Sequence, residues 1–261
     1  MSAKDLTEML DVRAGEPADL VLRRATLLDP VAGIDGVHDL VIRGGRVAEL
    51  AAPGEADAGD AEELDAEGLH AFPAFFDPHV HLRTPGQEHK EDVETGSRAA
   101  AAGGFCGIIA MANTSPPIST GADVTALREQ ARAQASVPIG FTATVTVDMK
   151  GEELTEMVEL RQAGAIAFSD DGLPIRSARI MRRALQYQRL CGGTIALHEE
   201  DPDLVAGGVM HEGPVSAALG LGGWPSVAES TMIFDVILKP IAVHNKGGTG
   251  NGKRREAKSN G

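Results

Sequence analysis

Residues 75–113 read FFDPHVHLRTPGQEHKEDVETGSRAAAAGGFCGIIAMAN and hold one complete strand–helix–strand pattern. The stretch 75–82 predicts a strand, and 92–102 predicts a helix that ends at a pair of glycines. The stretch 105–113 predicts the next strand. Strands joined through a helix lie parallel in one sheet, so this segment predicts an α/β fold.

The same alternation continues along the chain. Further strands are predicted at 138–147, 165–170 and 194–198, with helices at 122–135, 152–163, 176–190 and 225–238. Strands that alternate with helices in this way can form part of a (β/α)8 barrel or an open doubly wound sheet. A short apolar run, Ile241–His244, is a candidate sixth strand. We expect residues 72–244 to form a partial barrel of five to six β/α units.

The regions on either side of these units differ in character. Residues 1–17 form an N-terminal extension, and 18–71 predict a small β-sandwich portion with a hairpin turn at Gly44-Gly45 and a disordered loop at 52–64. Residues 245–261 carry five Lys or Arg against one Glu. Such a tail cannot pack, so we expect it to be disordered. A functional basic arm is one interpretation of it, and a frameshifted or artificial end after about residue 238 is the other.

Composition excludes several classes of protein. A net charge of −14 argues against a general nucleic-acid or acidic-membrane binder, since both need a positive surface. The chain has no apolar run of the length that spans a membrane, and its N-terminus lacks the features of a signal peptide. Two cysteines, Cys106 and Cys191, make no disulfide framework. We therefore expect a cytoplasmic protein.

The first predicted strand carries two histidines. In a strand, alternate side chains share a face, so Asp77, His79, His81 and Arg83 are expected to point the same way. Two imidazoles at the carboxyl end of a barrel strand can bind one divalent metal ion, at the end where barrel enzymes build their sites. Two ordinary strand histidines are the alternative.

Two later strands also end in candidate ligands. In 165–171 the bulky side chains Ile166 and Phe168 are expected to face the helices, which turns Asp171 toward the barrel axis. In 194–198 the same alternation turns His198 inward. A binuclear metal site would then form from His79, His81, Asp171 and His198. A turn at residues 170–172 and a solvated strand end at 198 are the alternatives.

Four separated stretches resemble one known family. These are PAFFDPHVHLRTPGQEHKED (73–92), AMANTSPP (110–117), FSDDGLP (168–174) and ALGLGGWPSVAE (218–229). In order and spacing they are similar to type I dihydroorotases of the amidohydrolase superfamily, with the likeness running from about residue 18 to about 237. The resemblance implies the metal-dependent-hydrolase (β/α)8 TIM-type barrel, incomplete here.

The resemblance also implies roles for single residues. His79 and His81 match ligands of the first zinc ion, Asp171 matches the carboxylate that bridges two metals, and His198 matches a ligand of the second. Arg83 and Asn113 match the groups that hold the substrate carboxylate. The implied reaction interconverts N-carbamoyl-L-aspartate and (S)-dihydroorotate in pyrimidine biosynthesis. Zinc is binuclear in the family, and we expect one or two ions here.

The chain departs from the family pattern near its end. The family's sixth-strand histidine and its late catalytic aspartate have no match after residue 237, so no catalytic residue is assigned. His244 and His211 are the candidates for the missing ligand, and a loop residue is the alternative for His211. We expect this C-terminally truncated chain to be inactive alone.

Two alternative functions stay open. Dihydropyrimidinases, hydantoinases and allantoinases are related, but many use a carboxylated lysine where this chain has Asp171. A non-catalytic dihydroorotase-like partner of aspartate transcarbamoylase is the other alternative. A homo-oligomer is a further expectation.

Overall fold

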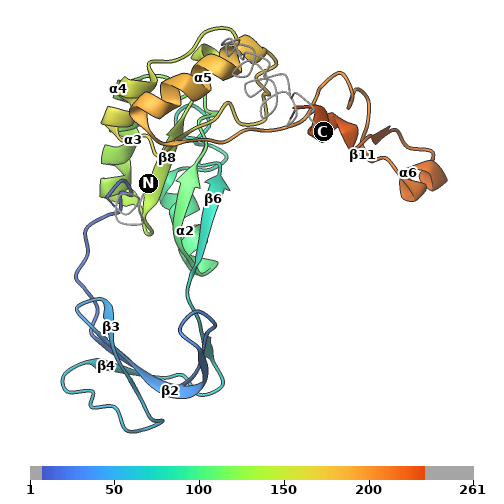
Figure 1. Ribbon diagram of the computed structural model, residues 1–261. Coiled ribbons are helices and arrows are strands. Elements are labelled where there is room, and N and C mark those ends of the chain that lie inside the picture. The colour runs from blue at the N-terminus through green and yellow to red at the C-terminus, as the bar shows by residue number, and fades with distance from the viewer. Residues whose placement is uncertain (1–7, 233–261) are drawn as a thin grey trace, which may run out of the picture.

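The structure, a computed structural model, describes residues 8–232, and within them the chain forms two five-stranded sheets (Figure 1). The first sheet comes before residue 72 and the second after residue 74. No helix in this described part is long and apolar enough to cross a membrane.

The first sheet is mixed. Its order is β3-β2-β1-β4, and β5 also pairs with β1. The five strands are β1 (Leu20–Asp29), β2 (Ile34–Arg43), β3 (Arg46–Ala51), β4 (Glu62–Asp65) and β5 (His70–Ala71). The predicted hairpin turn is confirmed, since Gly44 and Gly45 join β2 to β3 with φ of +57° and +72°. Two consecutive positive φ values suit the tight turn between twisted strands, and glycine adopts them without strain. The described residues supply one sheet here, so a sandwich stays a prediction.

The loop at 52–64 is not the disordered segment that its composition indicated. Ala56 and Ala58 are buried, and residues 62–65 form β4 alongside β1. The cause is Asp39, which is fully buried and accepts hydrogen bonds from the backbone N–H groups of Gly54 and Ala56 at 2.9 and 3.3 Å. A buried carboxylate needs such donors, and it fixes the loop that provides them.

Asp39 has two further partners. Arg23 donates to it from a guanidinium nitrogen at 2.8 Å, and the backbone N–H of Arg24 donates at 2.9 Å. Burial by itself would raise the pKa of Asp39, but these bonds together outweigh it and hold the pKa well below the ordinary 3.8. Asp39 is therefore charged at neutral pH. Its four hydrogen bonds join β2 to β1 and to the loop at 52–64.

The second sheet is parallel, and its strands follow one another in chain order, β6-β7-β8-β9-β10. A doubly wound sheet reverses its strand order at a switch point, whereas a barrel does not. This settles the choice between the two arrangements in favour of the barrel type. The elements are β6 (Phe75–Val80), α2 (Val93–Ala102), β7 (Phe105–Ala110), α3 (Gly121–Gln134), β8 (Ile139–Ala143), α4 (Met157–Ala163), β9 (Ala167–Phe168), α5 (Ala178–Cys191) and β10 (Thr194–Ile195).

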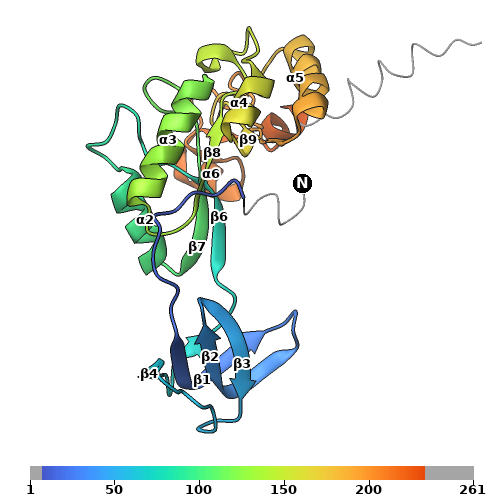
Figure 2. The ribbon, with the colours of Figure 1, turned by 90° about the vertical axis from the view of Figure 1, so that its left-hand side faces the viewer.

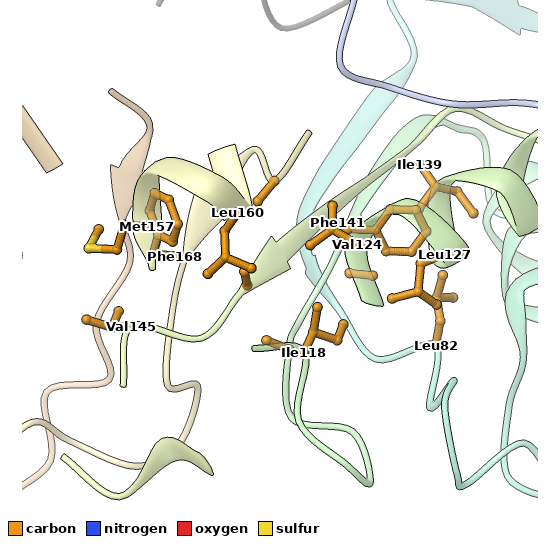
Figure 3. Close-up of a cluster of buried hydrophobic side chains, with 14 of the residues drawn as sticks. Leu82, Ile118, Val124, Leu127, Ile139, Phe141, Val145, Met157, Leu160 and Phe168 are labelled. Carbon is orange, nitrogen blue, oxygen red and sulfur yellow. The ribbon is translucent and has the colours of Figure 1, made fainter. Parts of the chain in front are cut away.

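Helices α2 to α5 follow one another around the outside of these strands (Figures 1 and 2). Helices α2 and α3 begin at capping boxes, Asp92 with Thr95 and Thr120 with Asp123. The main core lies between the strands and the helices. Figure 3 shows part of it, where Phe141 and Phe168 from the strands lie with Leu160, Met157 and other side chains from the helices and loops.

A smaller cluster lies on the inner face of the sheet. Ile109, Met111 and Ile166 pack there with Met9 and Leu10. Ile166 therefore does not share a face with Phe168, as strict alternation predicted, because the strand proper begins only at Ala167. Gly140 leaves the necessary space, since a Cβ there would lie 2.0 Å from Cδ1 of Ile166.

The N-terminal segment is attached to the amino end of this sheet. Asp11 exchanges backbone hydrogen bonds of 2.9 and 2.8 Å with Ile139 at the start of β8. Its carboxylate, almost fully buried, accepts from Arg128 at 2.5 Å and from Arg132 at 2.8 Å, both on α3. The segment is thus a structural part of the α/β unit.

We expect Asp11→Ala to lower the free energy of unfolding by about 2 kcal/mol, because two charged hydrogen-bond donors lose their acceptor. Urea denaturation measures this. Glu16→Ala, which removes an exposed acid from the same segment, is the control. An equal effect of both substitutions would contradict a role for the Asp11 contacts.

Beyond β10 the chain forms a separate parallel pair, β11 (Met210–His211) with β12 (Gly223–Trp224), around the short helix α6 (Pro214–Leu219). A helix starts at residue 227 and reaches the end of the described part at 232. The rest of the helix predicted at 225–238, the candidate strand Ile241–His244 and the tail 245–261 lie outside the described residues, as do residues 1–7.

Candidate metal centre

The end of β6 carries a one-residue irregularity. Asp77 pairs with Ile108 and Val80 with Ala110, so three steps on β6 match two on β7. Ile108, Ala110 and Val80 all belong to the core beneath the helices. His79 and His81, which flank Val80, therefore face the inner side, whereas Asp77 is out of step with them. Its carboxylate accepts instead from the backbone N–H of His79 at 3.0 Å.

Three of the four predicted ligands come together. One ligand atom from each of His79, His81 and Asp171 lies within 4.8 Å of the other two. The two imidazole rings have centroids 5.1 Å apart at 74°, and Nε2 of His79 lies 3.1 Å from Oδ1 of Asp171. The His79 side chain is 54% exposed and that of Asp171 is 12% exposed, so the group lies at the surface with a sheltered carboxylate.

Asn113 joins this group from the loop that follows β7. Its Oδ1 lies 2.9 Å from Nδ1 of His81, and its Nδ2 donates to Oδ2 of Asp171. The amide therefore connects a histidine from the end of β6 with the aspartate that follows β9. The family resemblance implied that Asn113 holds the substrate carboxylate, and it did not indicate these two bonds.

Asp170 and Asp171 are neighbours with different surroundings. Asp170 is buried and accepts from the backbone N–H groups of Val145 and Thr146 at 2.8 and 3.0 Å, and from the Thr146 hydroxyl. Burial raises the pKa of Asp170, against the effect of these bonds. Asp171 has a left-handed φ of +47°, and its N–H donates to Oγ of Ser169 at 2.9 Å. Asp170 thus fastens the chain after β9 to the chain after β8, and the turn that follows directs Asp171 to the histidines.

Arg83 lies two residues beyond His81, half-buried, with φ of +58°. Among the described residues its guanidinium has no hydrogen bond or ion pair. A half-buried guanidinium without a protein partner is suited to bind an anion of a ligand.

His198 is not part of the close group. Strand β10 ends at Ile195, so His198 lies in the chain beyond it, where its Nε2 is 2.9 Å from Oε2 of Glu200. Its side chain is 46% exposed. The predicted strand 194–198 is too long, and a loop residue need not follow the alternation of a strand. His211 is exposed in β11 and lines a cavity of about 200 Å³ together with Glu200 and Trp224.

The donor set of the close group suits a divalent transition-metal ion. Two imidazole nitrogens and one carboxylate oxygen are the ligand types of catalytic zinc sites with three protein ligands. The lysines within the described part have other partners, since Lys90 donates to Gln87 and Lys150 pairs with Asp148. The residues therefore fit a bound metal ion.

The structure is similar to solved structures of hydantoinases and dihydropyrimidinases. L-hydantoinase (dihydropyrimidinase) from Arthrobacter aurescens matches with a TM-score of 0.64 at 21% identity, covering 88% of this chain and 51% of that one. Dihydropyrimidinase from Brevibacillus agri matches with a TM-score of 0.61 at 24% identity, covering 86% and 50%. The chain thus shares the (β/α)-barrel fold of these proteins, and the described residues form five of its strands.

Sequence comparison places the chain more narrowly. A family profile described as dihydro-orotase-like matches residues 70–245. Dihydroorotase from Anaeromyxobacter sp. (strain K) is 45% identical over 215 residues, 82% of this chain and 49% of its own length. Dihydroorotase from Pelotomaculum thermopropionicum is 44% identical over 219 residues, 84% and 51%. The chain belongs to the dihydro-orotase-like family, and it spans about half the length of these relatives.

Proposed function

We propose that the chain carries the first metal site of a zinc-dependent dihydroorotase, which interconverts N-carbamoyl-L-aspartate and (S)-dihydroorotate. The observation that carries this proposal is the group of His79, His81 and Asp171 at the carboxyl end of a parallel sheet, in a chain of this family. In such barrels the carboxyl end holds the active site.

The three residues would hold a zinc ion through one ring nitrogen of each histidine and a carboxylate oxygen of Asp171. When bound, the ion would act as a Lewis acid toward the amide carbonyl and activate water. Asp171 is the one anionic member of the group, so it would supply most of the charge that attracts the cation. We also propose His198 as a ligand of a second ion. Because His198 lies outside the close group, the chain beyond β10 would have to move to bring it there.

Arg83 and Asn113 are proposed to bind the substrate carboxylate. The guanidinium of Arg83 has no hydrogen bond or ion pair among the described residues, and Arg83 lies two residues beyond His81 in the sequence. A planar guanidinium can hold a carboxylate through two parallel hydrogen bonds, which would fix the ring while its amide faces the metal ion.

We expect Arg83→Lys to weaken binding of dihydroorotate about tenfold, because lysine cannot form the bidentate pair. Calorimetry with the zinc-loaded protein measures the affinity. Arg98→Lys, on the nearby helix α2, is the control, since Arg98 is exposed outside the group. Equal affinities of Arg83→Lys and the unchanged protein would remove Arg83 from the site.

The proposed function is tested by the ligand that the zinc-loaded protein binds and turns over. Dihydroorotate is compared with hydantoin and dihydrouracil, and carbamoyl-aspartate cyclisation is followed under the same conditions. Zinc-dependent binding of dihydroorotate supports the proposal. Preference for hydantoin or dihydrouracil would assign the related alternative. Binding of dihydroorotate without turnover would indicate a non-catalytic homologue, and absence of zinc binding would overturn the proposal.

Other properties stay predictions. We place the protein in the cytoplasm with a small-molecule substrate, and we retain aspartate transcarbamoylase or a second copy as candidate partners. The division at residues 17, 71 and 244 also stays a prediction. Sedimentation of the protein alone and with aspartate transcarbamoylase would test the partners.

A further inference from the structure

We propose that Asn113 is a positioning residue, which fixes the tautomer of His81 and the orientation of Asp171 before a metal ion binds. The proposal rests on the metal site proposed above, and it gives Asn113 a task besides contact with substrate. It is carried by two hydrogen bonds of one side-chain amide, one to each of two candidate ligands.

The orientation of the amide follows from Asp171. An ionised carboxylate accepts hydrogen bonds and cannot donate them, so the Asn113 atom that faces Asp171 must be the NH₂ group. The other end of the amide, the carbonyl Oδ1, then faces His81 at 2.9 Å. The amide cannot be reversed without placing two acceptors against each other.

The tautomer of His81 follows from the amide. Because Oδ1 of Asn113 can only accept, the hydrogen between these two atoms must belong to Nδ1 of His81. A neutral imidazole carries one N–H, so Nε2 then keeps its lone pair. That nitrogen is the atom through which His81 can bind a metal ion.

The same amide restrains Asp171. Oδ2 of Asp171 accepts from Asn113, whereas Oδ1 faces Nε2 of His79 at 3.1 Å. The two oxygens are thus separated into one held by the amide and one turned to the histidine. The second N–H of the Asn113 amide and the second lone pair of Asn113 Oδ1 remain for other partners. A contact between Asn113 and substrate is therefore compatible with this role.

The test uses Asn113→Leu, which removes both bonds at similar volume, and Asn113→Asp, which keeps an acceptor for His81 but replaces the donor to Asp171 with a second acceptor. The first readout is the ¹⁵N chemical shifts of the His81 ring in the metal-free protein, which show the nitrogen that carries hydrogen. The second is the affinity for zinc and cobalt, measured by competition with a chelator. Thr142→Val is the control, because it removes a buried hydrogen bond of 2.8 Å from the neighbouring strand β8 without touching the group.

We expect the unchanged protein, Thr142→Val and Asn113→Asp to hold His81 with hydrogen on Nδ1. Asn113→Leu is expected to shift that hydrogen to Nε2 and to weaken metal affinity about 10–100-fold, as loss of such outer partners does. The same tautomer and affinity in Asn113→Leu as in the control would overturn the proposal. If Asn113→Leu fails to fold, a His81 with hydrogen on Nε2 in Asn113→Asp overturns it.

The outcome also separates this proposal from the proposed function. If the unchanged protein binds neither metal, the proposed function fails, while the ring shifts of the metal-free protein still decide the role of Asn113. If the metal binds and the ring shifts do not respond to Asn113→Leu, the proposed function stands and Asn113 is not a positioning residue.

Discussion

Asp171→Ala is expected to weaken zinc binding about 100-fold. A structural zinc ion with four ligands gains about 10–16 kcal/mol in binding, so each ligand contributes roughly 3 kcal/mol, which corresponds to that factor. Asp171 is the only anionic member of the close group among the described residues, and its loss also removes the partner of His79 and Asn113. Competition with a chromogenic chelator measures the affinity.

The matched control is Asp148→Ala, because Asp148 is an acid after β8 whose side chain is 51% exposed and pairs with Lys150. We expect it to leave the zinc affinity unchanged. A zinc affinity of Asp171→Ala equal to that of the control would exclude Asp171 as a ligand. His198 and Glu200 would then be the next candidates for the zinc ligands.

Asp39→Ala is expected to destabilise the first sheet by about 3–5 kcal/mol, because it leaves buried charged and polar donors without an acceptor. These donors are the Arg23 guanidinium and the backbone N–H groups of Arg24, Gly54 and Ala56. Hydrogen exchange of residues 20–51, followed by mass spectrometry, measures the loss separately from the second sheet. Asp35→Ala, at an exposed position of the same strand, is the control.

The lowered pKa of Asp39 makes its stabilisation of the first sheet depend on pH. Its charged form is favoured in the folded state, so the stabilisation is present above the ordinary value of 3.8 and is lost as pH falls through the lowered pKa. We expect protection of the first sheet to persist at pH 5 and to decline in strong acid. Asp39→Asn should lack this acid dependence, and an unchanged dependence would assign it to other groups.

Much of the barrel could be predicted from its local signals. The helix predicted at 92–102 is observed at 93–102, because Asp92 caps it and Gly103 follows it. Strands β9 and β10 are shorter than predicted, since a run of apolar residues shows that a segment is buried but not that it pairs along its whole length. The loop at 52–64 was misjudged because its order depends on Asp39, a residue distant in sequence.

The candidate site also has features that could be predicted from the sequence and features that could not. His79, His81 and Asp171 could be predicted to meet, because each lies at or just beyond the carboxyl end of a parallel strand, and these ends share one edge of the sheet. The contacts of Asn113 could not be predicted, since strand positions do not give the direction of an amide. The extra residue that sets Asp77 out of step also has no sequence signal beyond Pro78.

The attachment of Asp11 to α3 has a consequence for the order in which the protein is assembled. Asp11 and its partners Arg128 and Arg132 are 117 and 121 positions apart in the chain. At the usual pace of synthesis, 5–20 residues per second, Asp11 waits on the order of 10 s as a solvated carboxylate before either arginine exists. The start of β8, which pairs with Asp11, is made later still. The segment around Asp11 is thus synthesised before all of these partners and can take its place only after them.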